Sequence, residues 1–357
     1  MKPKTIKYQE VVIFYFSGTG NAKNAVLWID QMSKDRGFKS TIYNIEDLSG
    51  KDIPKISEYT LVGICSPTHG FNLPPIVLKF ISKLPRVKNV DAFILNTRAG
   101  VKMHKLFLPG LSGMAQYMSA MWLKLKGYRI VGMQPLDLPS NWLLVHPGLR
   151  GKVVDSIYQR CNSKVNEFTN KLLDGKRVYK AFLSLPFDLL VIPIALLYYF
   201  IGRFFLAKTL FASYTCNKCG LCVEKCPVNA IKMVSGRPFW THKCESCMRC
   251  ANICPQRSIE TAQVFAFSMI ILNSFIFTPL LILGLEFLGV FDLIEDSFVL
   301  NNIWIIVSSY LFLLFLFANY WVMHFLLGFD FFNKIMTYTS LSRFKFWRRY
   351  KAPKKFL

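Results

Sequence analysis

Two cysteine-rich runs in the second half of the chain carry most of the information about its fold. Residues 216–227 read CNKCGLCVEKCP, and residues 244–255 read CESCMRCANICP. Both runs follow the spacing C-x2-C-x2-C-x3-C-P, and together they contain eight of the chain's ten cysteines. The second run repeats the first after 28 residues, so the two form one duplicated unit.

This spacing predicts two [4Fe–4S] clusters, because three cysteines on a short loop can bind three irons while a distant fourth completes the cage. In this pattern the fourth cysteine of each run binds the cluster of the other run. The proline that follows it ends the preceding local structure. The predicted ligands are Cys216, Cys219, Cys222 and Cys254 for the first cluster, and Cys244, Cys247, Cys250 and Cys226 for the second.

Zinc binding and disulfide bonding both fit the cysteine spacing less well. A structural zinc site usually pairs two separated C-x2-C units, and the third cysteine and C-P of each run do not match that pattern. A disulfide framework is disfavoured by the close spacing and by the lack of an export signal. Apolar residues after the first run and before the second predict short strands beside the clusters, at Ile231, Met233, Phe239 and Trp240.

Composition favours a membrane as one partner. The 357-residue chain is 52% hydrophobic and has a formal net charge of +23. An excess of this size favours an anionic partner, such as a membrane surface, an acidic redox protein or a nucleic acid. The N-terminal apolar run is too short for a signal peptide and has no cleavage site, so we expect this part of the chain to stay in the cytoplasm.

The N-terminal half begins with a strand, a glycine-rich loop and a helix. Residues 11–16 are apolar and rich in β-formers, and SGTGNA follows directly at 17–22. Backbone amides at a helix N-terminus make a phosphate site, and we expect Asn21 to cap the helix. The motif is neither a Walker A sequence nor a dinucleotide fingerprint. A purely structural turn is the alternative.

Further strands are predicted at residues 39–43, 60–65, 92–95 and 128–133, with helices between them. Alternating strands and helices predict a doubly wound α/β fold with a parallel sheet. Ligands in such sheets bind at the carboxyl ends of the strands. Three polar loops are expected at that edge, at residues 17–22, 66–71 and 96–100.

The motifs FYFSGTGNA, SPTHGFNLPP and the two cysteine runs resemble flavodoxin, and more closely the bacterial flavodoxin–ferredoxin fusion proteins. The resemblance covers about residues 8–175 and 213–262. It implies a flavodoxin-like sheet of order 2-1-3-4-5, a small α+β ferredoxin domain, and FMN. The residues it assigns to the phosphate are Ser17, Gly18, Thr19, Gly20, Asn21 and Ala22. Those assigned to the isoalloxazine ring are Ser66, Pro67, Thr68, His69, Gly70, Phe71, Asn96, Thr97, Arg98, Ala99 and Gly100.

Some residues near these loops have more than one interpretation. Phe71 and Trp142 are candidates to stack on the flavin ring, although the ring-stacking aromatics of flavodoxins are not clearly reproduced. His69 either donates to the flavin or is a loop histidine bonded to backbone. Cys65 and Cys161 are expected to be packing residues.

Two long apolar segments predict a transmembrane hairpin. Residues 264–290 and 303–329 are long enough to cross a bilayer. The loop between them, at 291–297, is acidic, whereas the tail from Asn333 is rich in Lys and Arg. The positive-inside rule then places the redox domains and the tail in the cytoplasm. A buried soluble helical pair is the alternative.

A third apolar segment, residues 182–211, contains two prolines and three charged residues. One complete crossing there would place the two redox domains on opposite sides, so we expect an interfacial or re-entrant helix. The basic tail is predicted to bind anionic lipid. Nucleic acid is the weaker alternative, because no nucleic-acid-binding fold accompanies the tail.

The sequence thus predicts a membrane-anchored electron carrier that joins FMN to two [4Fe–4S] clusters and acts with redox partner proteins. The alternatives are an iron–sulfur flavoenzyme that reduces a small substrate, and a redox-sensing or assembly subunit. The absence of a nicotinamide fingerprint disfavours direct NAD(P)H oxidation. The predicted parts are a flavodoxin-like domain (1–178), an interfacial segment (179–212), a ferredoxin domain (213–263), a hairpin (264–329) and a basic tail (330–357).

Overall fold

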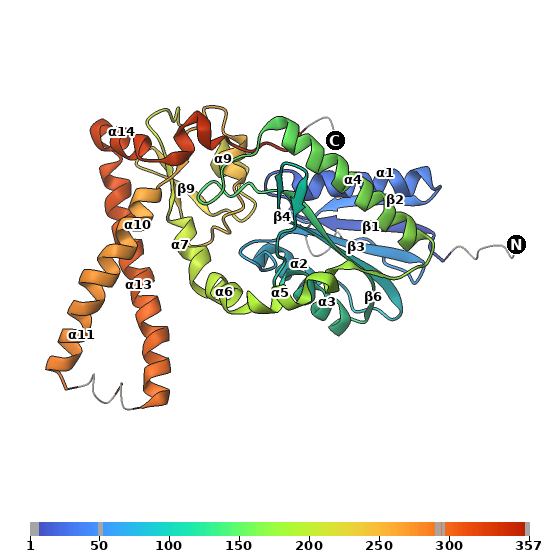
Figure 1. Ribbon diagram of the computed structural model, residues 1–357, viewed down its shortest axis with the longest axis horizontal. Coiled ribbons are helices and arrows are strands. Elements are labelled where there is room, and N and C mark those ends of the chain that lie inside the picture. Colours follow the sequence, from blue (N-terminus) through green and yellow to red (C-terminus); the bar gives the residue numbers. More distant parts are fainter. Residues whose placement is uncertain (1–6, 49–52, 290–293, 295–296, 354–357) are drawn as a thin grey trace, which may run out of the picture. The chain divides into compact units, whose positions relative to one another are not determined.

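A computed structural model describes residues 7–48, 53–289, 294 and 297–353, which form two compact units (Figure 1). Unit 1 consists of Met1–Trp142, His146–Tyr199 and Arg348–Leu357, and unit 2 of Leu143–Val145 and Phe200–Trp347. Residues 348–353 therefore belong to the same unit as residues 7–48. This return differs from the prediction, in which residues 330–357 form a separate basic tail.

Unit 1 is built on a parallel sheet of order β2-β1-β3-β4-β6-β7. With β6 as the fifth long strand, the predicted flavodoxin-like order 2-1-3-4-5 is confirmed. The central strands are almost continuously apolar because helices cover both of their faces. A short strand, β5, pairs antiparallel with the end of β4. The strands are β1 Glu10–Tyr15, β2 Lys39–Asn44, β3 Thr60–Pro67, β4 Val90–Met103, β5 Leu106–Leu108, β6 Tyr128–Pro139 and β7 Val178–Tyr179.

Four helices cover the sheet of unit 1, with α1 and α4 on one face and α2 and α3 on the other (Figure 1). The largest cluster of buried side chains lies under α1 and α4. Cys65 and Cys161 are both buried in this core, as expected of packing residues. The helices are α1 Asn21–Asp35, α2 Pro75–Lys83, α3 Ala115–Leu125 and α4 Gly151–Leu173.

The apolar segment after β7 is divided between the two units. Its two halves, Lys180–Leu190 and Ile192–Ala207, meet at a bend of 78°. Pro186 and Pro193 each stand in the first turn of a short helix, as expected of a residue that cannot donate a backbone hydrogen bond there. The elements are η1 Lys180–Ser184, α5 Leu185–Leu190, α6 Ile192–Leu197, a π-helix at Tyr198–Gly202 and α7 Arg203–Ala207.

The ferredoxin part of unit 2 has two antiparallel strand pairs, as its duplicated sequence suggests. β8 Leu210–Ala212 pairs with β11 Ile259–Thr261, and β9 Ile231–Val234 pairs with β10 Arg237–Trp240. The second pair contains the four apolar residues predicted to form short strands. Two short helices, α8 Leu221–Glu224 and α9 Arg249–Ile253, lie within the cysteine runs.

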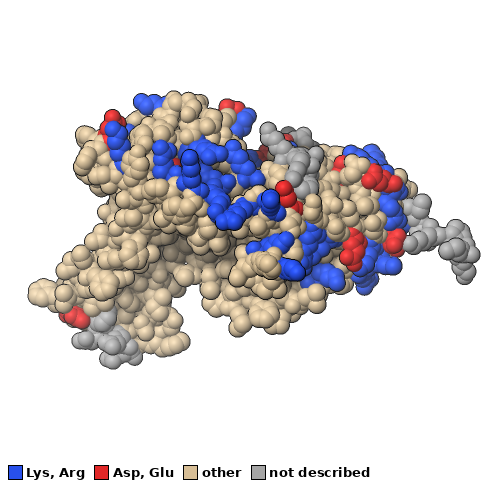
Figure 2. Space-filling model, turned by 45° about the horizontal axis from the view of Figure 1, so that its top comes forward, with Lys and Arg blue, Asp and Glu red and all other residues tan. Residues whose placement is uncertain are grey.

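Unit 2 also contains two helices that are long and apolar enough to cross a membrane, Gln263–Phe287 and Phe298–Leu326. The first consists of α10 Gln263–Leu272, a π-helical turn Asn273–Phe277 and α11 Thr278–Phe287, and the second is α13. Figure 2 shows no Lys or Arg on the visible face of these helices. Most of the predicted acidic loop lies outside the described residues. A further helix, α14 Asp330–Tyr338, follows α13.

Candidate functional site

The four cysteines predicted for the first cluster surround one small cavity in unit 2. Cys216, Cys219, Cys222 and Cys254 line it together with apolar residues, among them Met233, Pro238 and Ile259. Burial raises the pKa of the Cys222 thiol to about 11, and the neighbouring thiols of Cys216, Cys254 and Cys219 contribute to this rise. The cysteine from the second run therefore lies with the three from the first.

The second predicted group is gathered in the same way. Burial raises the pKa of Cys244 and of Cys247 to about 12 each, and in both cases the thiol of Cys226 also raises it. Burial also raises the pKa of Cys250, with Cys244 and Cys247 adding to the effect. The thiol of Cys226, from the first run, therefore lies close enough to the cysteines of the second run to raise their pKa values.

Backbone amides donate to the sulfurs of the two cysteines that are predicted to bind the cluster of the other run. The amide of Ala230 donates to Cys226 Sγ at 3.2 Å, and the amide of Ser258 donates to Cys254 Sγ at 3.4 Å. These two pairs occupy the same position in the 28-residue repeat. Such hydrogen bonds favour the thiolate form and help to set the potential of an iron–sulfur cluster.

These residues fit cubane clusters better than zinc. Within the described ranges, no three His, Cys, Asp or Glu side chains are arranged to hold a single metal ion. A cubane needs thiolates spread around four irons, whereas zinc draws its ligands to about 2.3 Å from one atom. A four-cysteine ring around a cavity matches the wider arrangement.

A buried lysine lies beside the second group. Lys208 is 3% exposed, and its ammonium donates to the carbonyl of Trp240 at 2.6 Å. It also lies 4.4 Å from the ring centroid of Tyr320, a residue of α13. Burial lowers the pKa of Lys208 to about 8, and the Cys244 thiol acts in the opposite direction. Cysteine spacing alone could not reveal this cation.

In unit 1, the glycine-rich loop has the backbone form that an anion site needs. Gly20 immediately precedes α1 with φ of 102°, a conformation that favours glycine. Its amide donates to Ser17 Oγ at 3.1 Å, which folds the loop back on itself. The side-chain amide of Asn141 donates to Thr19 Oγ1, so the loop after β6 supports this turn. The first-turn amides of α1 are then available to a phosphate.

The prediction that Asn21 caps α1 is wrong. Gly20 is the N-cap, and no side chain caps the helix. The Asn21 side-chain amide instead donates to the carbonyl of Pro139 at 2.9 Å. Its oxygen accepts from the hydroxyls of Tyr158, at 2.6 Å, and Tyr350. Asn21 is buried and therefore fixes the loop rather than facing a ligand.

Tyr350 belongs to a segment that we call the C-terminal strap, residues 348–353. Tyr350 is 6% exposed and is part of the main core of unit 1. Its hydroxyl lies 2.6 Å from that of Tyr158. The carbonyl of Arg348 accepts from the amide of Gly148 at 2.8 Å, and the carbonyl of Pro353 accepts from Asn24 at 3.4 Å. A Cβ at Gly20 would lie only 2.9 Å from that of Ala352.

The other two predicted loops are partly strand, because Ser66 and Pro67 end β3 and residues 96–100 all lie within β4. The backbone amide of Thr68 donates to the carbonyl of Thr97 at 2.8 Å, and the side-chain amide of Asn96 donates to Thr68 Oγ1. The predicted residues of these loops are therefore side by side. Arg98 turns toward the next strand, where it pairs with Asp137 at 2.7 Å.

The 66–71 loop is covered by the segment after β7. The ring of Tyr198 packs directly on Gly70, where an added Cβ would lie 2.2 Å from it. Tyr198 also contacts Trp142 edge to face, with ring centroids 6.1 Å apart. Asn72 donates to the carbonyl of Ala195 at 2.5 Å. Trp142 therefore lies close to Tyr198, which covers the loop, and the flavin contact expected of Trp142 stays a prediction.

Besides Lys208, four side chains of these sites were missed from sequence: Asn141, Tyr158, Tyr198 and Tyr350. None belongs to a motif, and each reaches its loop only through the fold. The partners Asn21 and Tyr350 are 329 residues apart in the chain. The tail has other aromatic residues close to Tyr350, at Phe344, Phe346 and Trp347, so nothing in its sequence draws attention to this contact.

Comparison with known proteins supports the iron–sulfur part. The family described as "4Fe-4S dicluster domain" matches residues 215–259. No curated protein matches the chain's sequence significantly. The chain therefore has an iron–sulfur ferredoxin domain beside a flavodoxin-like sheet.

Solved structures give weak global similarity. The rubredoxin oxygen:oxidoreductase of Desulfovibrio gigas is 16% identical with a TM-score of 0.34, and the match covers 48% of this chain but only 37% of that one. The Megasphaera elsdenii flavodoxin is 16% identical with a TM-score of 0.29, over 43% of this chain and 98% of its own. An archaeal flavodoxin is 14% identical with a TM-score of 0.29, covering 45% and 99%.

Proposed function

We propose that this chain is a membrane-anchored electron-transfer protein that passes single electrons between FMN in unit 1 and two [4Fe–4S] clusters in unit 2. The observation that carries the proposal is the grouping of eight cysteines into two sets of four, within the matched dicluster domain. Flavin exchanges one or two electrons and each cubane exchanges one. Joining them in one chain replaces diffusional encounter with a high effective concentration.

The residues of each site have defined roles in this proposal. The backbone of Ser17 to Ala22 would hold the FMN phosphate, because the first turn of α1 presents amide donors there, whereas Gly20 itself is packed against Ala352 of the strap. Asn21, Tyr158 and Tyr350 would hold that loop in shape. The amides on Cys226 and Cys254 would stabilise thiolate charge at the clusters. Bound FMN would allow the protein to connect a partner that exchanges two electrons with clusters that exchange one electron each.

The membrane proposal rests on the two long apolar helices, and the C-terminal strap supports its topology. The strap packs in the core of unit 1, which supports a topology in which the chain would leave and re-enter unit 1 on one side of the membrane. Only an even number of crossings between Tyr199 and Arg348 satisfies this. Two helices in that interval are long and apolar enough to span a membrane. A third crossing, by the bent segment, would place the strap on the opposite side of the membrane from the core of unit 1 in which it packs.

The bent segment is better suited to the membrane surface. One side of it is anchored in unit 1, where Asp188 accepts from the amides of Ser112 and Gly113 at 2.8 Å each. Other side chains of the same segment are exposed and apolar, including Phe182, Leu183, Phe187, Leu190, Ile194, Leu197 and Phe200. A helix held by protein on one side and apolar on the other favours the interfacial position. Nearby basic residues would bind anionic lipid.

Rapid reduction with dithionite under anaerobic conditions tests the function. Flavin and cluster absorbance are followed separately in the protein reconstituted in vesicles. Electrons should equilibrate between FMN and the clusters in the wild type. A Cys254→Ser variant should keep FMN yet deliver electrons more slowly to a protein or lipid-soluble acceptor. Unchanged delivery, together with turnover of a small substrate at the flavin, would replace the carrier with a reductase.

Cysteine labelling tests the topology. Ser342 is unsuitable because it is 2% exposed and bonded to Glu260, so Thr339, which is exposed, is the better position. Ser297→Cys and Thr339→Cys, in a background that keeps the eight ligands, should label from opposite faces of sealed vesicles. Labelling of both from one face would refute the hairpin.

A further inference from the structure

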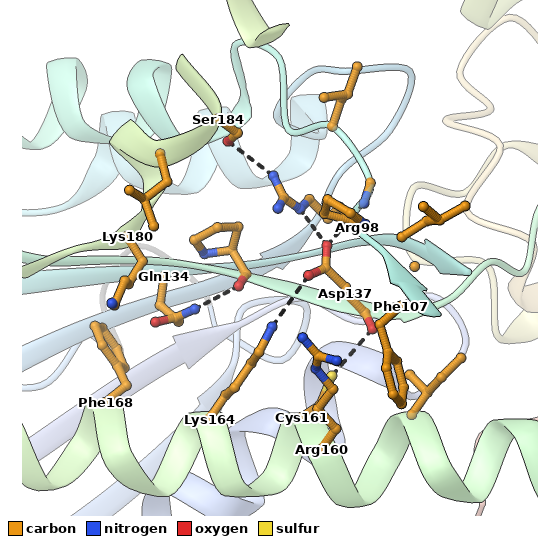
Figure 3. A pocket seen from close by; sticks show the side chains of 18 of the residues that line it. Arg98, Phe107, Gln134, Asp137, Arg160, Cys161, Lys164, Phe168, Lys180 and Ser184 are labelled. Atoms are coloured by element: carbon orange, nitrogen blue, oxygen red, sulfur yellow. Dashed lines mark hydrogen bonds and ion pairs between the residues drawn. The ribbon is translucent and has the colours of Figure 1, made fainter. Parts of the chain in front are cut away.

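Unit 1 contains a cavity of about 470 Å³ to which the proposed electron transfer gives no role, although Arg98 and Gly100, which the resemblance to flavodoxin assigns to the flavin ring, are among its lining residues. It lies between the end of β6, the long helix α4 and the segment from β7 to α5 (Figure 3). Its volume falls within the range of small-molecule sites, about 300–1,000 Å³. Its apolar walls include Phe107, Ile157, Phe168, Leu183 and Phe187.

The cavity exists because the sheet edge is left open there. In the described part of unit 1, β7 pairs only with Gly132 and Met133 of β6. The following residues of β6 pair with β4 on one side only, and Gln134, Pro135 and Asp137 line the cavity on the other. A proline suits such an edge because it has no amide to donate.

Cations outnumber acids around the cavity. Its lining contains five cations, Arg98, Lys164, Lys171, Arg160 and Lys180, and two acids, Asp137 and Glu167. Asp137 is shared by Arg98 at 2.7 Å and Lys164 at 3.6 Å. Glu167 is paired with Lys171, which lowers its pKa, and Lys180 adds to this lowering. The formal sum of these seven groups is +3, from five positive and two negative charges.

Arg160 is held in place without an acid. Its guanidinium lies 4.2 Å from the ring centroid of Phe107, and no described acid forms an ion pair with it. Arg160, Lys164 and Phe168 stand one turn apart on α4 and project toward the edge of β6 (Figure 3). One helix face thus presents positive charge next to an aromatic wall.

Two exposed apolar residues of the bent segment after β7 also line the cavity. Leu183 is 77% exposed and Phe187 is 61% exposed, yet both line the cavity. A ligand that contacts Leu183 and Phe187 needs an apolar portion. To bind stably beside the cations, the same ligand also needs a negative charge. Both requirements are met by the same class of molecule.

We propose that this cavity binds a small amphipathic organic anion, with its acidic group at the cations of α4 and Lys180 and its apolar body against Phe107, Phe168, Leu183 and Phe187. Carboxylates and phosphate monoesters share this chemistry. The proposal does not depend on the clusters or on electron transfer. It predicts a ligand preference that the ferredoxin and flavin sites do not explain.

Calorimetric titration of the full-length holoprotein in nonionic micelles tests the proposal, with empty micelles as the blank. The probe is 1-naphthoate, and 1-naphthamide is its uncharged isostere. The wild type should bind naphthoate at low ionic strength and bind the amide at least about tenfold more weakly. Equal binding of the two compounds, or no saturable binding of naphthoate, overturns the proposal.

Variants then locate the site. An exposed ion pair is worth up to about 1 kcal/mol, or about fivefold in affinity, so Arg160→Gln with Lys180→Gln should weaken naphthoate binding at least about tenfold. Lys152→Gln, an exposed change on α4 outside the cavity, is the matched control. Arg160→Lys with Lys180→Arg keeps the charge and should retain binding. Full affinity in the double glutamine variant, with FMN content unchanged, would contradict the proposed site.

Discussion

The cysteine groups of unit 2 and the glycine-rich loop of unit 1 are built over very different distances along the chain. All eight cysteines lie between residues 216 and 254, and their spacing alone assigns them to two sets. The loop at 17–22 is held by residues up to 329 positions away. One site is a local motif, whereas the other is a local motif held in shape by the fold.

This difference has a physical cause. Three of the four ligands of each cluster lie within one short loop, so their spacing is constrained by covalent geometry. A phosphate loop needs only free amides and a glycine, and many turns have those. What distinguishes such a loop is the packing that keeps it in one conformation. That packing comes from α4 and the C-terminal strap.

The largest expected effect tests the crossed ligand assignment. Cys254→Ser should remove one cluster and lower iron from about eight to about four atoms per chain. Adding Cys222→Ser should cause no further loss, because both residues belong to the same group, whereas adding Cys250→Ser should remove the second cluster. Iron analysis and absorbance of anaerobic protein measure this.

Cys161→Ser is the control for cysteine loss, since Cys161 is buried in unit 1 and its replacement should leave the iron unchanged. If Cys254→Ser and Cys222→Ser together remove both clusters, the fourth cysteine serves its own run. The local motif would then have been interpreted incorrectly.

The next effect tests the strap. Tyr350→Ala should lower the free energy of unfolding of unit 1 by about 3–5 kcal/mol, as for other large-to-small changes in a core. The loss of a hydroxyl bonded to Asn21 should also increase FMN release. Thermal unfolding followed by flavin fluorescence measures both. Tyr338→Ala is a matched control because Tyr338 is 56% exposed and lies in unit 2.

An unchanged unfolding temperature for Tyr350→Ala would show that the strap is not part of the folded unit. The even number of membrane crossings would then lose its support. This variant therefore tests the fold and the topology together.

Much of the architecture was accessible from sequence because it depends on local patterns. The five main strands contain short apolar runs that follow one another between polar loops. The sheet order, which the resemblance to flavodoxin implied, is also confirmed. The ends of strands were less accessible. β4 was expected to end at residue 95 but continues to Met103, because its polar second half pairs with both β6 and β5.

The candidate site was predicted in its backbone and missed in its side-chain partners. Residues 17–22, 66–71 and 96–100 were assigned to three loops of one site. Residues 96–100 are instead part of strand β4, where Asn96 and Thr97 are bonded to Thr68. The role of Asn21 was wrong because a capping rule considers only the adjacent helix. Tyr158 and Tyr350 both donate to the side-chain oxygen of Asn21, and no local rule includes them.

A smaller effect is expected at Asn21 itself. Asn21→Ala removes a buried amide and leaves the hydroxyls of Tyr158 and Tyr350 without their acceptor, which costs about 1–3 kcal/mol. We expect FMN affinity to fall about tenfold, because the loop loses its fixed shape. Fluorescence titration of the apoprotein with FMN measures the change. Thr41→Ala, on the edge strand β2, provides a comparison away from the loop. If Asn21→Ala binds FMN as tightly as wild type, the distant residues do not shape this site.

The smallest expected effect asks whether the cysteine site also depends on a distant residue. Lys208 is buried beside the second group, and a positive charge there stabilises the reduced, more negative cluster. Lys208→Met should therefore lower the potential of one cluster, by on the order of 50 mV if the interaction is screened as in a typical protein interior. Lys232→Met, an exposed change in β9, should leave both potentials unchanged. A redox titration followed by electron paramagnetic resonance resolves the two clusters.

A shift in the potential of one cluster only would show that the fold changes the properties of the cysteine motif through Lys208. If both variants have the same cluster potentials as the wild type, the two cysteine runs alone determine those potentials.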